Sequence, residues 1–393
     1  RGLGDVYKRQ MNNILKILMM CPVAAGGMLL ASCTDVEKIE IDHIGGYNTM
    51  DNAKSEAYYA KLREYKNQIW NYGRPVAFGW FSDWAQQGAS RGGYLTSVPD
   101  SMDIISMWSG APDRFEITPE QKADKEFVQK KKGIKLLEVS LLSHLGKGRT
   151  PESIYIDLYK QAKAEKWSDS QLKEAKKLAR WDYWGFTSHE LNNYNELAAA
   201  HSRFAKALCD SLVVNEWDGF DIDWEPGNGF NDADGTLAGN MHQNRLILHL
   251  VQEMGKYIGP KSDPEGTGHK LLCVDGQISI FYDDCPEYID YFILQSYGRV
   301  DDLDYYVPNT HKFILTENFE QFASIGGQLF RQASYMPASG YKGGVGAYRF
   351  QKDYDNTPDY KYMRRAIQEN QRVFNEWKAA QAKDSQGENS DQQ

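Results

Sequence analysis

The sequence predicts a single (β/α)8 barrel of the TIM type, in the α/β fold class, and three observations support this prediction. Short apolar runs alternate with helical stretches along most of the 393 residues, which is typical of βαβ units around a parallel sheet. There are eight such runs. Together they span roughly 275 residues, close to the size of about 250 residues that is typical of one barrel. We find no internal repeat and no second domain.

The eight apolar runs are the predicted barrel strands. They are residues 76–81, 103–108, 134–141, 219–225, 270–275, 291–297, 312–317 and 343–350. Residues 52–70 are charged and helix-forming, a long helical region extends from 151 to about 213, and a charged helix over 359–382 closes the barrel. We therefore place the barrel domain at 73–382. The polar tail 383–393 is expected to be disordered.

The beginning of the chain has the pattern of an export signal. We expect residues 1–10 not to be part of the native protein, because a normal-looking signal peptide follows them at 11–32. Lys16 supplies its positive charge, and the apolar run after it is too short for a permanent membrane span. The run ends in Leu-Ala-Ser-Cys, which is typical of a lipobox with Cys33 as the lipidated residue. Residues 33–72 would then be a tether and an N-terminal helix, attached to a membrane by lipid only. An ordinary secretory signal with a chance cysteine is the alternative.

Charge and cysteine content exclude several classes of partner and cofactor. The net charge is −9, and removal of the first 32 residues would leave about −12, which argues against nucleic acid or an anionic membrane surface as a partner. Cys209, Cys273 and Cys285 do not form a disulfide framework, and no spacing indicates a metal site. Cys273 and Cys285 could pair in an oxidising compartment. We expect no metal and no other cofactor.

The fourth strand carries the candidate chemistry. Side chains alternate between the faces of a strand, so Asp221, Asp223 and Glu225 point to one side and the apolar residues between them to the other. Carboxylates inside a barrel cost several kcal/mol each unless they are hydrogen-bonded or protonated, and this forces their pKa values apart. Such separation can make an acid and a base from like groups.

Glu225 comes last, at the carboxyl end of the strand, where barrel enzymes hold their active sites. Asp218 is out of phase with the three acids, and we expect it to have a structural role near the start of the strand. A solvated acidic loop, in which the spacing of the acids arises by chance, is the alternative. The regular alternation with bulky apolar residues favours the strand.

The segment from Asp218 to Glu225 reads DGFDIDWE and resembles the DxxDxDxE motif of glycoside hydrolase family 18, the chitinases and endo-β-N-acetylglucosaminidases. The resemblance extends over residues 74–382, although only the fourth strand carries a strong motif. The lipobox and acidic tether resemble those of glycan-utilisation lipoproteins of Bacteroidetes. This resemblance implies an outer-membrane lipoprotein, at the cell surface or on the periplasmic side, which binds a glycan and works beside other glycan-uptake proteins.

The resemblance also implies a mechanism and the residues that perform it. Glu225 would be the general acid and then the base that activates water. Asp223 would orient the 2-acetamido group of the substrate, whose oxygen is the nucleophile, so that an oxazolinium forms and configuration is retained. Asp221 would hold Asp223 and share its proton. Tyr297, at the end of the sixth strand, would hydrogen-bond the acetamide or else be a packed core residue, and Gln295 would contact the sugar or the acetamide.

Further substrate contacts are expected at the carboxyl ends of other strands. Asp275 after the fifth strand, and Glu317 and Asn318 after the seventh, are candidate sugar contacts. Trp80 near the end of the first strand is a candidate stacking platform, with core packing as the alternative. Tyr348 occupies the neighbourhood in which many chitinases of the family have a tryptophan floor on the eighth strand. The SxGG run of their third strand is only loosely matched by VSLLSHLGKG here.

These features predict a retaining hydrolase that cleaves GlcNAc-β-1,4-GlcNAc linkages. The departures on the third and eighth strands favour an endo-β-N-acetylglucosaminidase acting on N-glycans over a chitinase. A surface glycan-binding protein that kept the barrel without hydrolysis is the alternative from another class. The presence of both Asp223 and Glu225 favours an enzyme.

Overall fold

The computed structural model describes residues 54–84, 91–108, 117–227 and 232–390, which belong to one folded unit, Asn52–Gln393. The predicted leader 1–10, the signal peptide 11–32 and the lipidation site Cys33 lie outside the described residues. No helix in the described part of the chain is both long and apolar enough to cross a membrane.

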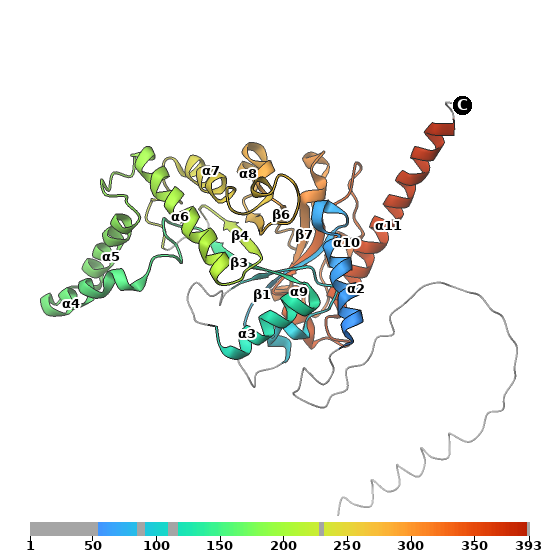
Figure 1. Ribbon diagram of the computed structural model, residues 1–393, viewed down its shortest axis with the longest axis horizontal. Coiled ribbons are helices and arrows are strands. Elements are labelled where there is room, and N and C mark those ends of the chain that lie inside the picture. Colours follow the sequence, from blue (N-terminus) through green and yellow to red (C-terminus); the bar gives the residue numbers. More distant parts are fainter. Residues whose placement is uncertain (1–53, 85–90, 109–116, 228–231, 391–393) are drawn as a thin grey trace, which may run out of the picture. The chain divides into compact units, whose positions relative to one another are not determined.

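Eight parallel strands form a closed barrel in which each strand pairs with the next and the last pairs with the first (Figure 1). They are β1 (Val76–Phe81), β2 (Ile104–Met107), β3 (Lys135–Leu141), β4 (Gly219–Trp224), β5 (Leu271–Gly276), β6 (Tyr291–Leu294), β7 (Phe313–Asn318) and β8 (Gly344–Tyr348). The predicted (β/α)8 fold is confirmed. Every strand begins at the predicted residue or one residue later, because the apolar runs mark the buried segments directly.

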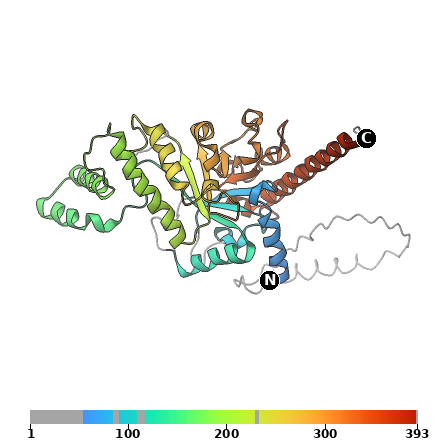
Figure 2. The same ribbon diagram turned by 45° about the horizontal axis from the view of Figure 1, so that its top comes forward.

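Helices surround the barrel, as Figures 1 and 2 show. They are α2 (Glu56–Asn67), α3 (Pro119–Glu126), α4 (Ile156–Glu165), α5 (Asp169–Tyr183), α6 (Tyr194–Val214), α7 (Gln243–Met254), α8 (Ser279–Asp284), α9 (Phe319–Phe322), α10 (Leu329–Ser334) and α11 (Lys361–Ser390). The predicted helical region between β3 and β4 is three helices, α4 to α6. Ser168 and Gln171 form a capping box that begins α5.

The polar tail, for which the sequence predicts disorder, continues α11 as a helix as far as Ser390. Its last turns are rich in alanine, glutamine and lysine, which favour helix. Extending an existing helix also needs no new nucleation step, so a polar segment can remain helical after the packed part has ended.

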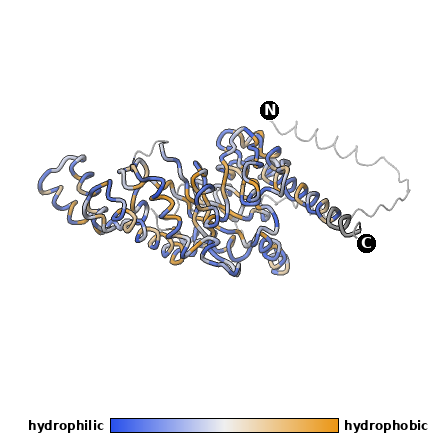
Figure 3. The backbone as a smooth tube through the Cα atoms, turned by 90° about the horizontal axis from the view of Figure 1, so that it is seen from above, coloured by the Kyte–Doolittle hydropathy of each residue, from blue (hydrophilic) through white to orange (hydrophobic). Residues whose placement is uncertain are grey.

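The core has two layers. One lies between the strands and the helices and includes Phe220, Ile222 and Trp224, the apolar residues of β4. The other fills the inside of the barrel and includes Phe78 and Trp80 of β1. In Figure 3 hydrophobic stretches run through the middle of the backbone tube and alternate with hydrophilic ones along the coiled segments. Phe220, Ile222 and Trp224 thus face the helices. Asp221 and Asp223, which alternate with them, face the barrel interior, as the strand pattern predicts.

The three cysteines in the described part of the chain, Cys209, Cys273 and Cys285, are buried and free. The possible pairing of Cys273 with Cys285 is not formed. Cys273 lies on β5 inside the barrel, whereas Cys285 follows α8 in the layer outside it, so the wall of the barrel separates the two thiols.

Candidate active site

The inner face of β4 carries two buried aspartates and, at its open end, one glutamate. Strand pairing places Asp221 between Val139 and Cys273, and Asp223 between Leu141 and Asp275. Asp221 and Asp223 are buried, whereas Glu225, one residue past the end of β4, is half-buried. The three acids therefore follow one another from the interior of the barrel to its carboxyl-end opening.

Asp221 is held by donors from two neighbouring strands. Its Oδ2 accepts a hydrogen bond from the indole N–H of Trp80 on β1 at 3.0 Å and one from the hydroxyl of Ser106 on β2 at 2.7 Å. Its Oδ1 is buried without a donor. Burial raises the pKa of Asp221, and the two hydrogen bonds oppose that rise. Ser106 did not emerge from the sequence, because a single serine in an apolar strand has no distinctive pattern.

Asp223 lies beside Asp275 of β5, its neighbour in the strand register. Asp221 uses its Oδ2 on Trp80 and Ser106, and the expectation that it shares a proton with Asp223 stays a prediction. Asp275, which was expected to be a sugar contact, is only 1% exposed and does not reach the surface of the site. Burial raises the pKa of both carboxyls, that of Asp275 well above its ordinary value, and the charge of Asp223 adds to the rise at Asp275.

Glu225 is positioned by the backbone where β4 and β5 end together. The N–H of Gln277 donates to the carbonyl of Trp224 at 2.7 Å. Gly276 has a φ of +77°, and a Cβ there would lie 2.5 Å from the Trp224 carbonyl oxygen and 2.9 Å from Cγ of Glu225. Only glycine therefore fits at position 276 without displacing the stem of Glu225.

Aromatic side chains adjoin the acids at the same end of the barrel. Tyr297 is half-buried. Burial raises the pKa of its phenol, and the charges of Asp275, Asp223 and Glu225 add to this rise. Its ring centroid lies 6.2 Å from that of Tyr348. Both tyrosines thus lie where the sequence placed candidate substrate contacts.

Trp108, just after β2, completes the aromatic group. Its ring meets that of Tyr348 edge-on, with the ring centroids 5.9 Å apart. Sequence reasoning missed Trp108 as a site residue. Its place as the last residue of the second apolar run, at the same strand end as Glu225, is the feature that could have identified it.

Trp80 is packed in the core and is not a stacking platform. It is 1% exposed, meets Phe78 edge-on at a centroid distance of 4.8 Å and uses its indole N–H on Asp221. Core packing, the alternative to a stacking platform, is therefore correct for Trp80. Trp80 contributes to the site only by its hydrogen bond to Asp221.

Glu317 is fully buried and its carboxylate is used by the backbone, so it is not a sugar contact. Oε1 accepts the N–H groups of Gly298 at 2.9 Å and Asn318 at 2.7 Å, and Oε2 accepts that of Gln328 at 2.6 Å. A buried carboxylate is stabilised by such donors. Through Gly298, Glu317 fixes the loop that carries Tyr297.

Two other predicted contacts have less specific surroundings. Asn318 is the N-cap of α9, where its Oδ1 accepts the N–H of Glu320 at 2.9 Å. Gln295 is half-buried and follows β6, which ends at Leu294, earlier than predicted. Asp218 has the structural role expected of it, since its Oδ2 accepts from the N–H of Leu136 at 2.9 Å and from the Gln129 amide at 2.6 Å.

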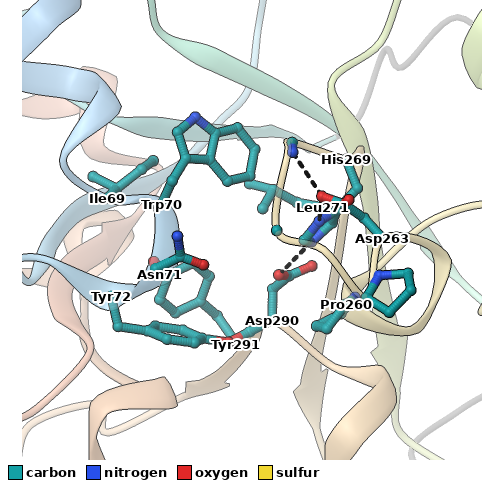
Figure 4. A pocket seen from close by; sticks show the side chains of 13 residues that line it. Ile69, Trp70, Asn71, Tyr72, Pro260, Asp263, His269, Leu271, Asp290 and Tyr291 are labelled. Carbon is teal, nitrogen blue, oxygen red and sulfur yellow. Dashed lines mark hydrogen bonds and ion pairs between the residues drawn. The ribbon is translucent and has the colours of Figure 1, made fainter.

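A separate pocket of about 240 Å³ lies at the opposite, amino-terminal ends of β5 and β6 (Figure 4). Trp70, Tyr72 and His269 are among the residues that line it. Its charged side chains bond to one another, because Nε2 of His269 lies 2.8 Å from Asp290 and Nδ1 lies 3.3 Å from Asp263. This pocket is remote from Glu225. Among the described residues, no group of three or more His, Cys, Asp or Glu is arranged to hold a metal ion.

The chain was compared with known families and structures. The model of glycoside hydrolase family 18, BT1044-like, matches residues 34–369. A selenomethionine structure of BT1044 with a glutamate-to-glutamine substitution is 26% identical, with a TM-score of 0.59, over 81% of this chain and 93% of that one. No curated protein sequence matches.

Structures of an endo-β-N-acetylglucosaminidase from Cordyceps militaris share the fold. A doubly substituted variant in complex with fucosyl-N-acetylglucosamine-Asn is 18% identical with a TM-score of 0.53, over 82% of this chain and 98% of that one. The apo form is 19% identical with a TM-score of 0.52 and the same coverage. The family match spans the described barrel and its DGFDIDWE strand, and the chain therefore belongs to glycoside hydrolase family 18, in its BT1044-like group.

Proposed function

We propose that this protein is a retaining glycoside hydrolase that cleaves the GlcNAc-β-1,4-GlcNAc linkage of N-glycan cores, as an endo-β-N-acetylglucosaminidase. The observation that carries the proposal is the row of acids on β4, two buried and hydrogen-bonded and the third, Glu225, at the opening beside Tyr297. A buried acid beside a half-exposed one is the arrangement in which one carboxyl orients a substrate and the other transfers protons.

In the proposed first step, protonated Glu225 gives its proton to the glycosidic oxygen. The acetamide oxygen of the sugar on the non-reducing side attacks the anomeric carbon, the bond to the glycosidic oxygen breaks, and the leaving sugar departs as an alcohol. A cyclic oxazolinium remains. The Glu225 carboxylate then takes a proton from water, whose oxygen attacks the anomeric carbon and opens the ring. Two displacements on opposite faces retain the configuration.

Asp223 and Tyr297 would stabilise the acetamide during this step. The Asp223 carboxylate would accept the acetamide N–H and so support the positive charge that develops on the ring. The Tyr297 hydroxyl is a donor for the acetamide oxygen. Glu225 and Tyr297 both follow strand ends at the carboxyl end of the barrel, just beyond Asp223. In this proposal one bound acetamide contacts both Asp223 and Tyr297.

An N-glycan is favoured over chitin as the substrate. The eighth strand ends in Tyr348 rather than in the tryptophan floor of many chitinases, and Tyr348 is half-buried. A tyrosine ring still stacks on a sugar, with less area than an indole. The Cordyceps enzyme, which has the same fold, was solved with fucosyl-N-acetylglucosamine-Asn, the sugar–asparagine end of an N-glycan.

The test is incubation of the full chain with a high-mannose glycoprotein, a complex-type glycoprotein and a chitin oligomer, with products read by mass spectrometry. We expect a glycan to be released from a glycoprotein, with one GlcNAc left on the asparagine. Cleavage of chitin alone would overturn the N-glycan assignment. Glycan binding by the wild type without any release would show a binding protein instead.

Glu225→Gln tests the assignment of the general acid. Gln cannot transfer the proton, and loss of general acid–base catalysis lowers the rate on the order of 100- to 10,000-fold. We expect kcat to fall by that factor while glycan binding persists. Glu190→Gln, at an exposed position on the connection to α6, is the matched control and should keep wild-type kcat. Wild-type kcat in Glu225→Gln would place the acid elsewhere.

A further inference from the structure

The three buried aspartates around the centre of the barrel have more acceptor atoms than donors. Asp221, Asp223 and Asp275 are at most 3% exposed, and Oδ1 of each is buried without an N–H or hydroxyl donor. Buried oxygens without a donor are rare, and a carboxyl without one gains it by binding a proton or a ligand.

Asp223 and Asp275 differ from Asp221 in the hydrogen-bond donors that surround their carboxyls. Asp221 has two donors, Trp80 and Ser106, whereas Asp223 and Asp275 are neighbours in the strand register and Oδ1 of each is buried without a partner. Two buried carboxyls side by side repel each other if both are charged. A proton bound by one of them removes this repulsion and supplies a donor for the other.

Asp275 is the member of the pair that fits the donor role. It lies one strand away from the motif and is more deeply buried than Asp223, at 1% against 3% exposure. The groups that face it are acidic or neutral: Asp221, Asp223 and Glu225 from β4, Cys273 from β5 and Tyr297 after β6. No cation in the described surroundings of Asp275 would stabilise a second negative charge there.

We propose that Asp275 is a positioning residue that stays protonated and donates its hydrogen bond to Asp223, so that Asp223 carries the charge and keeps its orientation toward the acetamide. This inference rests on the proposed function for its consequence in catalysis. The bound proton itself does not depend on any substrate.

The first experiment measures the bound proton without any activity assay. In the wild type, the folded chain holds one proton on this pair that the unfolded chain releases above the ordinary aspartate pKa of 3.8. Asp275→Asn keeps a donor of the same shape and removes that proton. We expect the pH dependence of the unfolding constant between pH 5 and 8 to change by one proton, which is a factor of about 10 per pH unit.

Asp283→Asn, at an exposed position after the same strand, is the control and should leave the pH dependence unchanged. An Asp275→Asn variant with the wild-type pH dependence would overturn the proposal, whether or not the protein hydrolyses glycans. Should Asp275→Asn fold too weakly to measure, a carboxylic acid band in the infrared spectrum of the folded wild type at pH 7, lost in Asp275→Ala, decides the same point.

The second experiment separates positioning from a merely structural role. Asp275→Ala removes the donor, and misplacement of a reacting group by about 1 Å costs about 100-fold in rate. We expect kcat to fall by about that factor with little change in KM, because Asp275 is too buried to touch the sugar. Asp275→Asn should restore kcat to within about 10-fold of wild type, since its amide donates in the same place. Equal losses in the two variants would contradict the proposal, whereas an inactive wild type would contradict the proposed function alone.

Discussion

At the scale of single residues, identical side chains in this barrel have different surroundings and therefore different chemistry. Asp221 and Asp223 are two residues apart on one strand, yet Asp221 accepts from an indole and a hydroxyl, whereas Asp223 lies beside a second carboxyl, that of Asp275. The strand pattern predicts that both point inward. It contains no information about the partners, which come from β1, β2 and β5.

Asp223→Asn tests the role of Asp223 as the group that supports the acetamide. Asn cannot carry the charge that stabilises the positive oxazolinium, so we expect kcat to fall on the order of 100-fold or more. A preformed oxazoline substrate bypasses the step that is lost. The variant should therefore still transfer a glycan from an oxazoline to a GlcNAc acceptor, as measured by mass spectrometry. A wild-type rate of hydrolysis in Asp223→Asn would refute this role.

At the scale of elements, the sequence predicts the strands better than the contacts at their ends. All eight strands begin where an apolar run begins, because burial on both faces of a parallel strand leaves a continuous apolar segment. Glu317 shows the limit of this reasoning. A glutamate at a strand end has the same appearance in sequence whether it faces a ligand or, as here, accepts three backbone N–H groups.

Trp80 and Trp108 show the same limit for aromatic residues. Both lie in or just after a barrel strand, and only the three-dimensional packing makes Trp80 a buried donor and leaves Trp108 half-buried beside Tyr348. The acids of β4 were predictable because three carboxylates at a spacing of two are rare in an apolar strand. A single aromatic residue in such a strand is common.

Gly276→Ala tests the junction of β4 and β5. The added Cβ would collide with the carbonyl of Trp224, the last residue of β4, and with Cγ of Glu225, the residue that follows it. We expect kcat to fall by about 100-fold through displacement of Glu225. Gly239→Ala is the matched control, because Gly239 has a φ of +75° and no atom within 4 Å of the added Cβ.

Gly276→Ala and Gly239→Ala both place alanine at a positive φ and so share its backbone strain. Only Gly276→Ala also brings the added Cβ into collision with neighbouring atoms. Gly239→Ala should therefore lower the melting temperature with little effect on kcat, since strain of this kind costs about 1–2 kcal/mol. Equal kcat values in the two variants would show that Gly276 serves the turn alone and does not position Glu225.

At the scale of the whole molecule, the two ends of the barrel have different tasks. The carboxyl ends of the strands hold acids and half-buried aromatic rings, whereas the amino ends of β5 and β6 hold the Asp263–His269–Asp290 network (Figure 4). Asp290 also accepts the N–H of Leu272 at 2.8 Å, so the network ties the segment before β6 to the beginning of strand β5. Polar groups that satisfy one another at this end stabilise the fold.

His269 gives this network a predictable pH dependence. Desolvation lowers the pKa of His269, but the bonds and charges of Asp290 and Asp263 outweigh it, and the pKa is raised above the ordinary 6.5. A raised histidine pKa contributes stability that is fully present below pH 6.5 and is lost as the pH rises through the folded-state value. The half-buried position of His269 reduces the size of the effect through solvent screening.

His269→Gln should therefore lower the melting temperature more at pH 6 than at pH 9. Because the buried aspartates also make the wild type less stable as the pH rises, the comparison needs a double-mutant cycle with Asp290→Asn at both pH values. We expect a favourable coupling between His269 and Asp290 at pH 6 that shrinks at pH 9, as thermal unfolding would measure. A coupling that is the same at both pH values would mean that His269 bonds to Asp290 as a neutral ring, and that the charge of the imidazolium plays no part in closing this end of the barrel.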